Sequence, residues 1–229
     1  MIKKNKFQMC LLITFIALSL SACSTSKDTP VRVGTNGLQS AEVEKEYDLK
    51  TGVEESDITA EVEITEWLGE TSDPSEKTFF KANLVKVYKN KINPSLKEIK
   101  LMQEGNSEVT LKEYPLFKKG DKLILFLKKS ADVEDTYWIL GAHTSAIQVK
   151  ETEGKEFAIK YVGKLDKLSN IEVNKSDSQI SKALEKIDTE LKQEFKNYKN
   201  SNKEGFYKEL SERQIFDKEL LDKELQSVK

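Results

Sequence analysis

The sequence predicts a mainly β domain, a small antiparallel barrel or sandwich, followed by two C-terminal helices. Between Asp57 and Val162 apolar and polar residues alternate, and turn-forming residues recur about every 10 to 20 positions. After Val162 the apolar spacing changes to three or four residues, which is typical of amphipathic helices. A third observation is an apolar run near the N-terminus that stops at a cysteine. These patterns divide the chain into segments 1–22, 23–56, 57–162 and 163–229.

Residues 1–22 have the pattern of an export signal peptide. Lys3, Lys4 and Lys6 form a basic start without an acidic residue, and the apolar run CLLITFIALSL follows at 10–20. A stable transmembrane helix needs roughly 20 apolar residues, so this run is shorter than a transmembrane helix requires. A transmembrane anchor is the alternative interpretation of the same stretch.

The four residues Leu20, Ser21, Ala22 and Cys23 resemble the lipobox of bacterial lipoproteins. In that motif a signal peptidase cleaves before a cysteine that carries diacylglycerol on its sulfur. The resemblance implies that the first three residues are read by the peptidase and that Cys23 is the lipidation site. Acyl chains such as palmitate would then anchor the protein stably to the membrane. We therefore expect a lipoprotein at the extracytoplasmic face of the cell membrane.

Cleavage before Cys23 has consequences for cysteine chemistry and charge. It removes Cys10, so the mature chain would hold no disulfide, no free thiol and no cysteine metal site. It also removes three lysines, which leaves 34 basic and 39 acidic residues and a formal charge of −5. Nucleic acid is not an expected partner, because its binding needs a strongly basic face.

Segment 23–56 is predicted to be the lipidated cysteine and a flexible tether. Its apolar residues are scattered without a sustained period, so it buries too little surface to order itself. As a coil, its 33 residues after Cys23 would span about 30 Å on average and about 110 Å when fully extended. The alternative is that AEVEKEYDL, at 41–49, forms a helix docked on the domain.

Segment 57–162 is predicted to contain about seven short strands. Ile58 begins a clear alternation that continues to Ile64, and the run from Leu123 to Leu127 is apolar on both faces, which indicates a central strand. The apolar phase slips by one residue between Leu84 and Val85, which predicts a β-bulge. Short strands at this spacing are typical of an antiparallel barrel or sandwich.

The C-terminal segment is predicted to be helical in two parts. The first part has Ser176 or Asp177 as its N-cap. Its apolar stripe comprises Ile180, Leu184, Ile187, Leu191, Phe195 and Tyr198. The second begins at Phe206 and carries Leu210, Ile215, Leu220, Leu221 and Leu225. This tail could pack on the barrel, form a helical hairpin or associate with a partner.

No catalytic constellation is visible in the sequence. The one histidine, His143, has no nucleophile elbow or reactive cysteine to partner it, and no metal-binding motif or cofactor motif is present. We therefore predict a protein without cofactor, metal or catalytic residues. A pair of carboxylates for glycoside cleavage stays open, because such residues are distant in sequence.

Three aromatic residues are candidates for a ligand surface. Trp67, Tyr137 and Trp138 stand at the ends of predicted strands. They could pack in the core, or they could offer rigid aromatic area for a peptide or a glycan at the mouth of a barrel.

From Asp57 to about Gly141 the order of features resembles a group of small exported proteins of Gram-positive bacteria whose role is not established. The segments that carry it are DITAEVEITEWLG, FKANLVKVYKNK, IKLMQEGN, PLFKKGDKLILFLKK and TYWILG. The resemblance implies an oligonucleotide/oligosaccharide-binding type of barrel, as in netrin-like and metalloprotease-inhibitor domains. The inhibitors place a free N-terminal cysteine on the catalytic zinc of their target. An acylated Cys23 cannot do so.

The leading hypothesis is a non-enzymatic surface lipoprotein whose barrel binds a peptide, a protein or a cell-wall ligand. One alternative is a hydrolase of cell-wall polymer that uses a carboxylate pair. The other is an assembly protein that acts through its helical tail.

Overall fold

The structure is a computed structural model of the 229-residue chain. It describes residues 37–39, 45–111, 115–166, 168–194 and 213–228. The predicted signal peptide and lipobox, including Leu20, Ser21, Ala22 and Cys23, lie outside the described residues.

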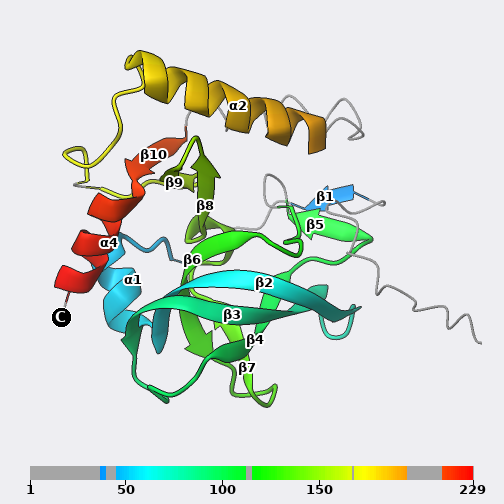
Figure 1. The fold of residues 1–229 in the computed structure, drawn as a ribbon. Coiled ribbons are helices and arrows are strands. Elements are labelled where there is room, and N and C mark those ends of the chain that lie inside the picture. Colours follow the sequence, from blue (N-terminus) through cyan, green and yellow to red (C-terminus); the bar gives the residue numbers. More distant parts are fainter. Residues whose placement is uncertain (1–36, 40–44, 112–114, 167, 195–212, 229) are drawn as a thin grey trace, which may run out of the picture.

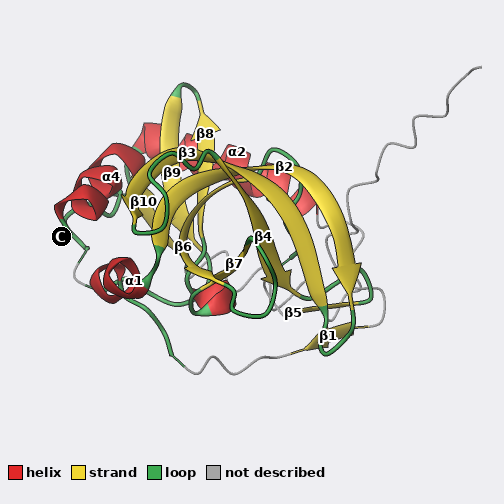
Figure 2. Ribbon diagram, turned by 90° about the horizontal axis from the view of Figure 1, so that it is seen from below, coloured by secondary structure: helices red, strands yellow, loops and turns green. Residues whose placement is uncertain are grey.

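Five strands close into a barrel (Figures 1 and 2). They are β2 (Ile58–Thr71), β3 (Lys77–Asn90), β4 (Glu98–Glu104), β6 (Lys122–Lys129) and β7 (Thr136–Ile139). The order is β6-β2-β3-β4-β7, and β7 pairs back onto β6. Only the β4–β7 pair of this barrel is parallel. The structure confirms the predicted barrel and removes the sandwich alternative.

Bulges shape the long β2–β3 hairpin, which curves around the barrel in Figure 2. Glu61 pairs with Lys86 and Val62 pairs with Leu84, so Val85 has no opposite residue. This is the bulge that the sequence predicts. Three further register shifts lie along the same pair of strands. Because each bulge bends its strand and increases its twist, the bulges help a hairpin of two 14-residue strands to follow a closed surface.

The barrel interior is filled by alternate residues of its strands. It contains aliphatic side chains from β2, β3, β4 and β6 and the rings of Phe80, Phe117 and Tyr137. The rings of Phe80 and Phe117 are tilted, with centroids 5.9 Å apart. The interior is therefore a packed core and not a ligand cavity.

Strand β6 is buried on both faces, as its composition predicts. Leu123, Leu125 and Leu127 point into the barrel, whereas Ile124 and Phe126 belong to a second core outside it. Helices α1 (Leu49–Glu55) and α4 (Lys218–Ser227) cover this outer face through Leu49, Val53, Leu221 and Leu225. Figure 1 shows the two helices side by side on one flank of the barrel.

Three strands extend the barrel sheet beyond β6. The first half of β6 pairs with β8 (Ile147–Thr152), which continues to β9 (Lys155–Lys160) and β10 (Gln214–Asp217). Helix α2 (Ser178–Glu194) packs on this extension through Ala183, Leu184, Ile187 and Leu191. Asp177 caps α2, because its carboxylate accepts from the backbone N–H groups of Gln179 and Ile180.

Two short elements complete the fold. The 3₁₀ turn η1 (Ala142–Thr144) follows β7. Strand β5 (Val109–Leu111), in the connection from β4 to β6, pairs in parallel with β1 (Gly37–Gln39) near the N-terminus.

The prediction of a flexible tether over 23–56 is wrong for its C-terminal part. Residues 37–39 form β1, and residues 49–55 form the docked helix α1. Asp48 caps α1 through the backbone N–H of Thr51. The apolar residues of this segment look scattered in the sequence because a helix of two turns buries only Leu49, Gly52 and Val53.

Lysines from the barrel hold the C-terminal end of α1. Lys89 donates to the carbonyls of Val53 and Glu54, and Lys91 donates to the Glu54 carbonyl over 3.1 Å. Lys128 donates to the Glu55 carbonyl over 3.2 Å. The helix has no basic residue in its own last turn, so these partners supply the positive charge that its C-terminus favours.

The boundary predicted at Val162 is also wrong. Residues 214–217 form β10 and pair with β9, so the C-terminal segment contributes a strand to the same sheet. Ile215 lies in this strand, and helix α4 begins after it at Lys218. The predicted start of the second helical part at Phe206 lies outside the described residues. Four residues are too few to show a strand period against the helical spacing around them. None of the helices within the described residues is long and apolar enough to cross a bilayer.

We expect Gly52→Ala to destabilise the protein by about 1–3 kcal/mol, the usual range for overpacking. A Cβ at this position would lie 2.6 Å from two atoms of the Phe126 ring. Urea unfolding measures the change, and Lys50→Ala on the exposed side of α1 is the control. If α1 were undocked, Gly52→Ala would instead leave stability unchanged or raise it, because alanine favours a helix.

Candidate functional site

A groove of about 490 Å³ lies on the outer face of the barrel, beside β4, β7 and the end of β6. Its apolar lining comes from Met102, Trp138, Ile139 and Ala142. Its polar rim comes from Lys77, Glu104, Lys128, Lys129 and the loop Ser130–Asp132. Volumes of this size are typical of small-ligand sites.

The strand register explains why Trp138 faces this groove. Phe79, Met102 and Trp138 are successive partners across β3, β4 and β7, and Trp138 pairs with Lys128 of β6. Neighbouring residues of a strand point to opposite faces, so this row points outward while Phe80, Leu101 and Tyr137 point inward. Trp138 is 38% exposed, a large fraction for so large an apolar side chain.

Ion pairs hold most of the charged side chains at the rim. Lys77 Nζ lies 3.0 Å from Glu104 Oε1, and Lys128 Nζ lies 3.1 Å from Asp57 Oδ1. Lys129 Nζ is 3.9 Å from a carboxylate oxygen of Asp135, which is itself highly exposed. The rim thus presents both donors and acceptors, with little unbalanced charge.

Asp57 fixes the end of β6 behind the groove. Its carboxylate accepts from the backbone N–H of Lys129 over 3.0 Å and from Lys128 Nζ. Burial alone would raise the pKa of Asp57, but these hydrogen bonds and the lysine charges outweigh it, so the pKa lies below its usual value. A stable negative charge at Asp57 therefore positions Lys128.

The structure separates the three aromatic residues that the sequence offers as a ligand surface. Tyr137 is 5% exposed and belongs to the barrel core. Trp67 is partly buried against the same core, and its indole N–H is buried without a hydrogen-bond partner. Only Trp138 lines the groove. The surface interpretation is thus wrong for Tyr137, and Trp67 lies apart from the groove.

Sequence reasoning missed the partners of Trp138. Met102 and Lys77 belong to other strands, and they lie near Trp138 only because β3 pairs with β4 and β4 pairs with β7. The alternation in EIKLMQE does contain a local signal, because it assigns Met102 to the face opposite Leu101. This alternation gives no information on which strand lies beside β4.

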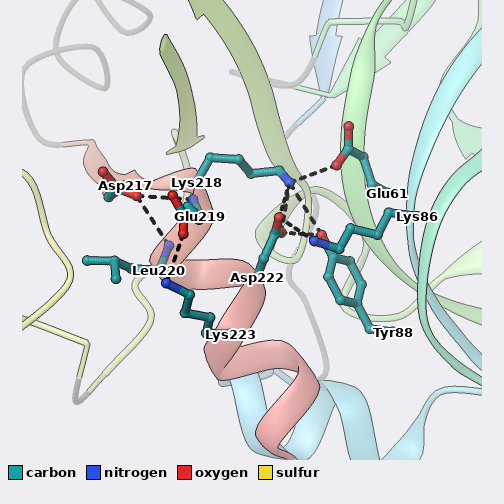
Figure 3. A network of polar contacts seen from close by, with 9 residues as sticks. All are labelled: Glu61, Lys86, Tyr88, Asp217, Lys218, Glu219, Leu220, Asp222 and Lys223. Carbon is teal, nitrogen blue, oxygen red and sulfur yellow. Dashed lines mark hydrogen bonds and ion pairs between the residues drawn. The ribbon is translucent and has the colours of Figure 1, made fainter.

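A second cluster of polar side chains fastens α4 to the barrel (Figure 3). Lys218 Nζ lies 2.8 Å from Glu61 Oε2 and 2.7 Å from Asp222 Oδ1. Asp222 also accepts from Lys86 over 2.8 Å and from the Tyr88 hydroxyl over 2.5 Å. Two lysines and two carboxylates balance one another, so we interpret this cluster as a structural clamp.

The contacts within the clamp keep Lys218 and Asp222 charged and Tyr88 neutral. Burial favours the neutral forms of Lys218 and Asp222. For Lys218 the hydrogen bonds to Asp222 and Glu61 outweigh the effect of burial. For Asp222 the hydrogen bonds from Lys218, Lys86 and Tyr88 outweigh it. The pKa of Lys218 is therefore raised, and that of Asp222 is lowered. Burial and the neighbouring Asp222 raise the pKa of Tyr88, so its hydroxyl stays protonated and donates.

A third polar feature is the buried amine of Lys160 in β9. The side chain is 1% exposed, and its Nζ donates to the carbonyl of Thr144 in η1. Burial lowers the pKa of Lys160 to about 8. The nearby Ser145 hydroxyl is buried and has no hydrogen-bond partner. Neither residue lines the groove, so we interpret Lys160 as a structural residue whose hydrogen bond connects β9 to η1.

Two carboxylates line the groove, those of Glu104 and Asp132. Glu104 is held in an ion pair with Lys77. Among the described residues, no three histidine, cysteine or acidic side chains form a group that could hold a metal ion.

No protein-family model matches the chain, and no curated protein sequence matches it.

We expect Lys218→Met to destabilise the protein by about 3–5 kcal/mol at pH 7, because it leaves Glu61 buried without its cation and removes one of the two lysines that pair with Asp222. The pKa of Asp222 is lower in the folded state, so its contribution is present near neutral pH and is lost as the pH falls through the folded value. The loss caused by Lys218→Met should therefore shrink toward pH 3. Urea unfolding checks this, with the exposed Lys223→Met as control. An equal loss in both variants would contradict the clamp.

The stability of the protein should depend on Lys160 at alkaline pH. The folded pKa is about 8 and the ordinary value is 10.5, so the unfolded chain binds more protons between them and stability rises with pH. Relative to Lys160→Met, the wild type should gain about 2–3 kcal/mol from pH 8 to pH 10. The exposed Lys186→Met is the control in urea unfolding at both pH values. Parallel pH profiles of wild type and Lys160→Met would show that the amine is not buried in this way.

Proposed function

We propose that the protein is a non-enzymatic lipoprotein that binds an extracytoplasmic ligand in the groove over Trp138. The proposal combines the lipobox-like residues 20–23 with the resemblance of 57–141 to exported proteins of Gram-positive bacteria. The membrane is then one partner, through diacylglycerol on Cys23. A peptide, a protein or the cell wall supplies the other.

The observation that carries the ligand site is the position of Trp138. The other two candidate aromatic residues pack in the barrel core, whereas Trp138 is exposed at the floor of a groove. A tryptophan that is exposed to water contributes less hydrophobic stabilisation to the fold than a buried one. A rigid aromatic surface framed by polar groups is a common form of binding site. The groove also lies at the loop between β6 and β7, a loop that barrels of this connectivity use for ligands.

The attachment of β1 supports a position close to the membrane. Only the 13 residues 24–36 separate Cys23 from Gly37, where pairing with β5 begins. Fully extended, they reach about 45 Å, less than half the length expected for a tether ending at Ser56. The lipid would thus hold the groove within the space next to the bilayer.

The contacts of the groove favour binding over hydrolysis. Glu104 is paired with Lys77, and Lys128 is paired with Asp57, so these side chains are held in place as hydrogen-bonding groups for a ligand. The tail packs within the same chain, because α4 buries its apolar face on the barrel and α2 buries its apolar face on the sheet extension.

Crosslinking on intact cells tests this function. We expect the wild type to capture a wall or membrane component and Trp138→Ala to lose at least nine-tenths of that capture. Trp67→Phe is the matched control, because it replaces a tryptophan away from the groove and should keep the capture. Cys23→Ala should leave the membrane fraction. Undiminished capture by Trp138→Ala would overturn the groove, and membrane retention of Cys23→Ala would overturn the anchor.

A further inference from the structure

We propose that the groove binds a sugar chain of little net charge, with one ring stacked on Trp138. This inference rests on the proposed function, since it names the chemical class of the ligand in the same groove. It is drawn from the shape of the apolar floor, from the pairing of the strands beneath it and from the balance of charge at its rim.

The apolar floor suits the flat face of a sugar ring. Met102 and Trp138 are direct partners on adjacent strands, and strands lie about 4.8 Å apart, so the two side chains form a narrow platform. A pyranose ring has C–H groups on its faces and hydroxyls around its edge. A stacked ring would therefore cover Trp138 while its hydroxyls reach the polar rim.

The strand segments that form the apolar floor cannot accept a further strand. Strand β4 pairs with β3 and β7, and β7 pairs with β4 and β6. The segment of β6 that lines the groove adjoins β7 on one edge. A peptide that binds by strand addition obtains its affinity from main-chain hydrogen bonds to an open edge. Met102 has partners in β3 and β7, and Trp138 has partners in β4 and β6, so the floor offers no such edge and an extended peptide could not add a strand there.

The rim does not favour a polyanion. Glu104 neutralises Lys77, and Asp57 together with the Glu55 carbonyl engages Lys128. Glu104 and Asp132 would also repel phosphate groups in the groove. The same ammonium and carboxylate groups can donate to and accept from sugar hydroxyls. Hydrogen bonds to charged groups are stronger than those between neutral groups.

Tryptophan fluorescence of the lipidated Trp67→Phe protein, in a detergent without a sugar headgroup, reports on Trp138 alone. The probes are an N-acetylglucosamine tetramer, maltotetraose, polyglutamate and inorganic polyphosphate. We expect a saturable change with at least one of the sugars and less than a twofold change in its affinity between 50 and 500 mM salt. In Glu104→Gln the sugar should bind about fivefold more weakly, as when one hydrogen bond is lost.

The other outcomes overturn the sugar proposal in distinguishable ways. A response to polyphosphate or polyglutamate alone, falling steeply with salt and increasing in Glu104→Gln, would keep the groove as a site but assign it to an anion. No saturable response to any probe would overturn the sugar class. Whether the groove binds any ligand is then decided separately by the dependence of cellular capture on Trp138.

Discussion

The fold depends on the pairing of β6, the strand at which the barrel and the sheet extension meet. Along one edge it pairs with β2, while along the other its first half pairs with β8 and its last residues pair with β7. Closure of the barrel and extension of the sheet thus use different halves of the same edge. Because one face of β6 fills the barrel and the other supports α1 and α4, its alternate side chains connect two hydrophobic cores. Phe126 illustrates the constraint, since its ring packs so closely against α1 that only glycine fits at position 52.

The chain contains many lysines, and the fold accommodates the less exposed ones in three ways. Lys218 enters a buried cluster with Glu61 and Asp222, where opposite charges offset the cost of desolvation. Lys89 instead satisfies the carbonyl groups at the end of α1, although burial and the nearby Lys91 lower its pKa to about 8. Lys160 donates to the backbone carbonyl of Thr144, and burial lowers its pKa by a similar amount. In each case the amine fastens a peripheral segment to the barrel sheet.

The candidate site follows from the same geometry. A strand of four residues, β7, lies between β4 and β6 and presents Tyr137 to the core and Trp138 to the groove. Asp57 holds the end of β6 through both the backbone of Lys129 and the side chain of Lys128, so the floor and one side of the groove share a rigid support. Strand β1 joins the domain at β5, which follows β4 after a short turn. The proposed anchor at Cys23 would therefore be linked to the groove through the strand that carries Met102 and Glu104.

Local sequence determined the elements whose physical cause is local. Alternation over Ile58–Ile64 defines a strand, a phase slip at Val85 defines a bulge, and the spacing from Ile180 to Leu191 with Asp177 before it defines a capped helix. The export signal and lipobox are also predicted locally, because such motifs are recognised in extended chain. Tertiary structure alone decided that residues 49–55 dock, that residues 214–217 join the sheet and that Trp138 faces outward. These outcomes depend on contacts between distant positions, such as Lys86 with Asp222, 136 residues apart. No short window of sequence contains both partners of such a contact, so its energy cannot appear in a local pattern.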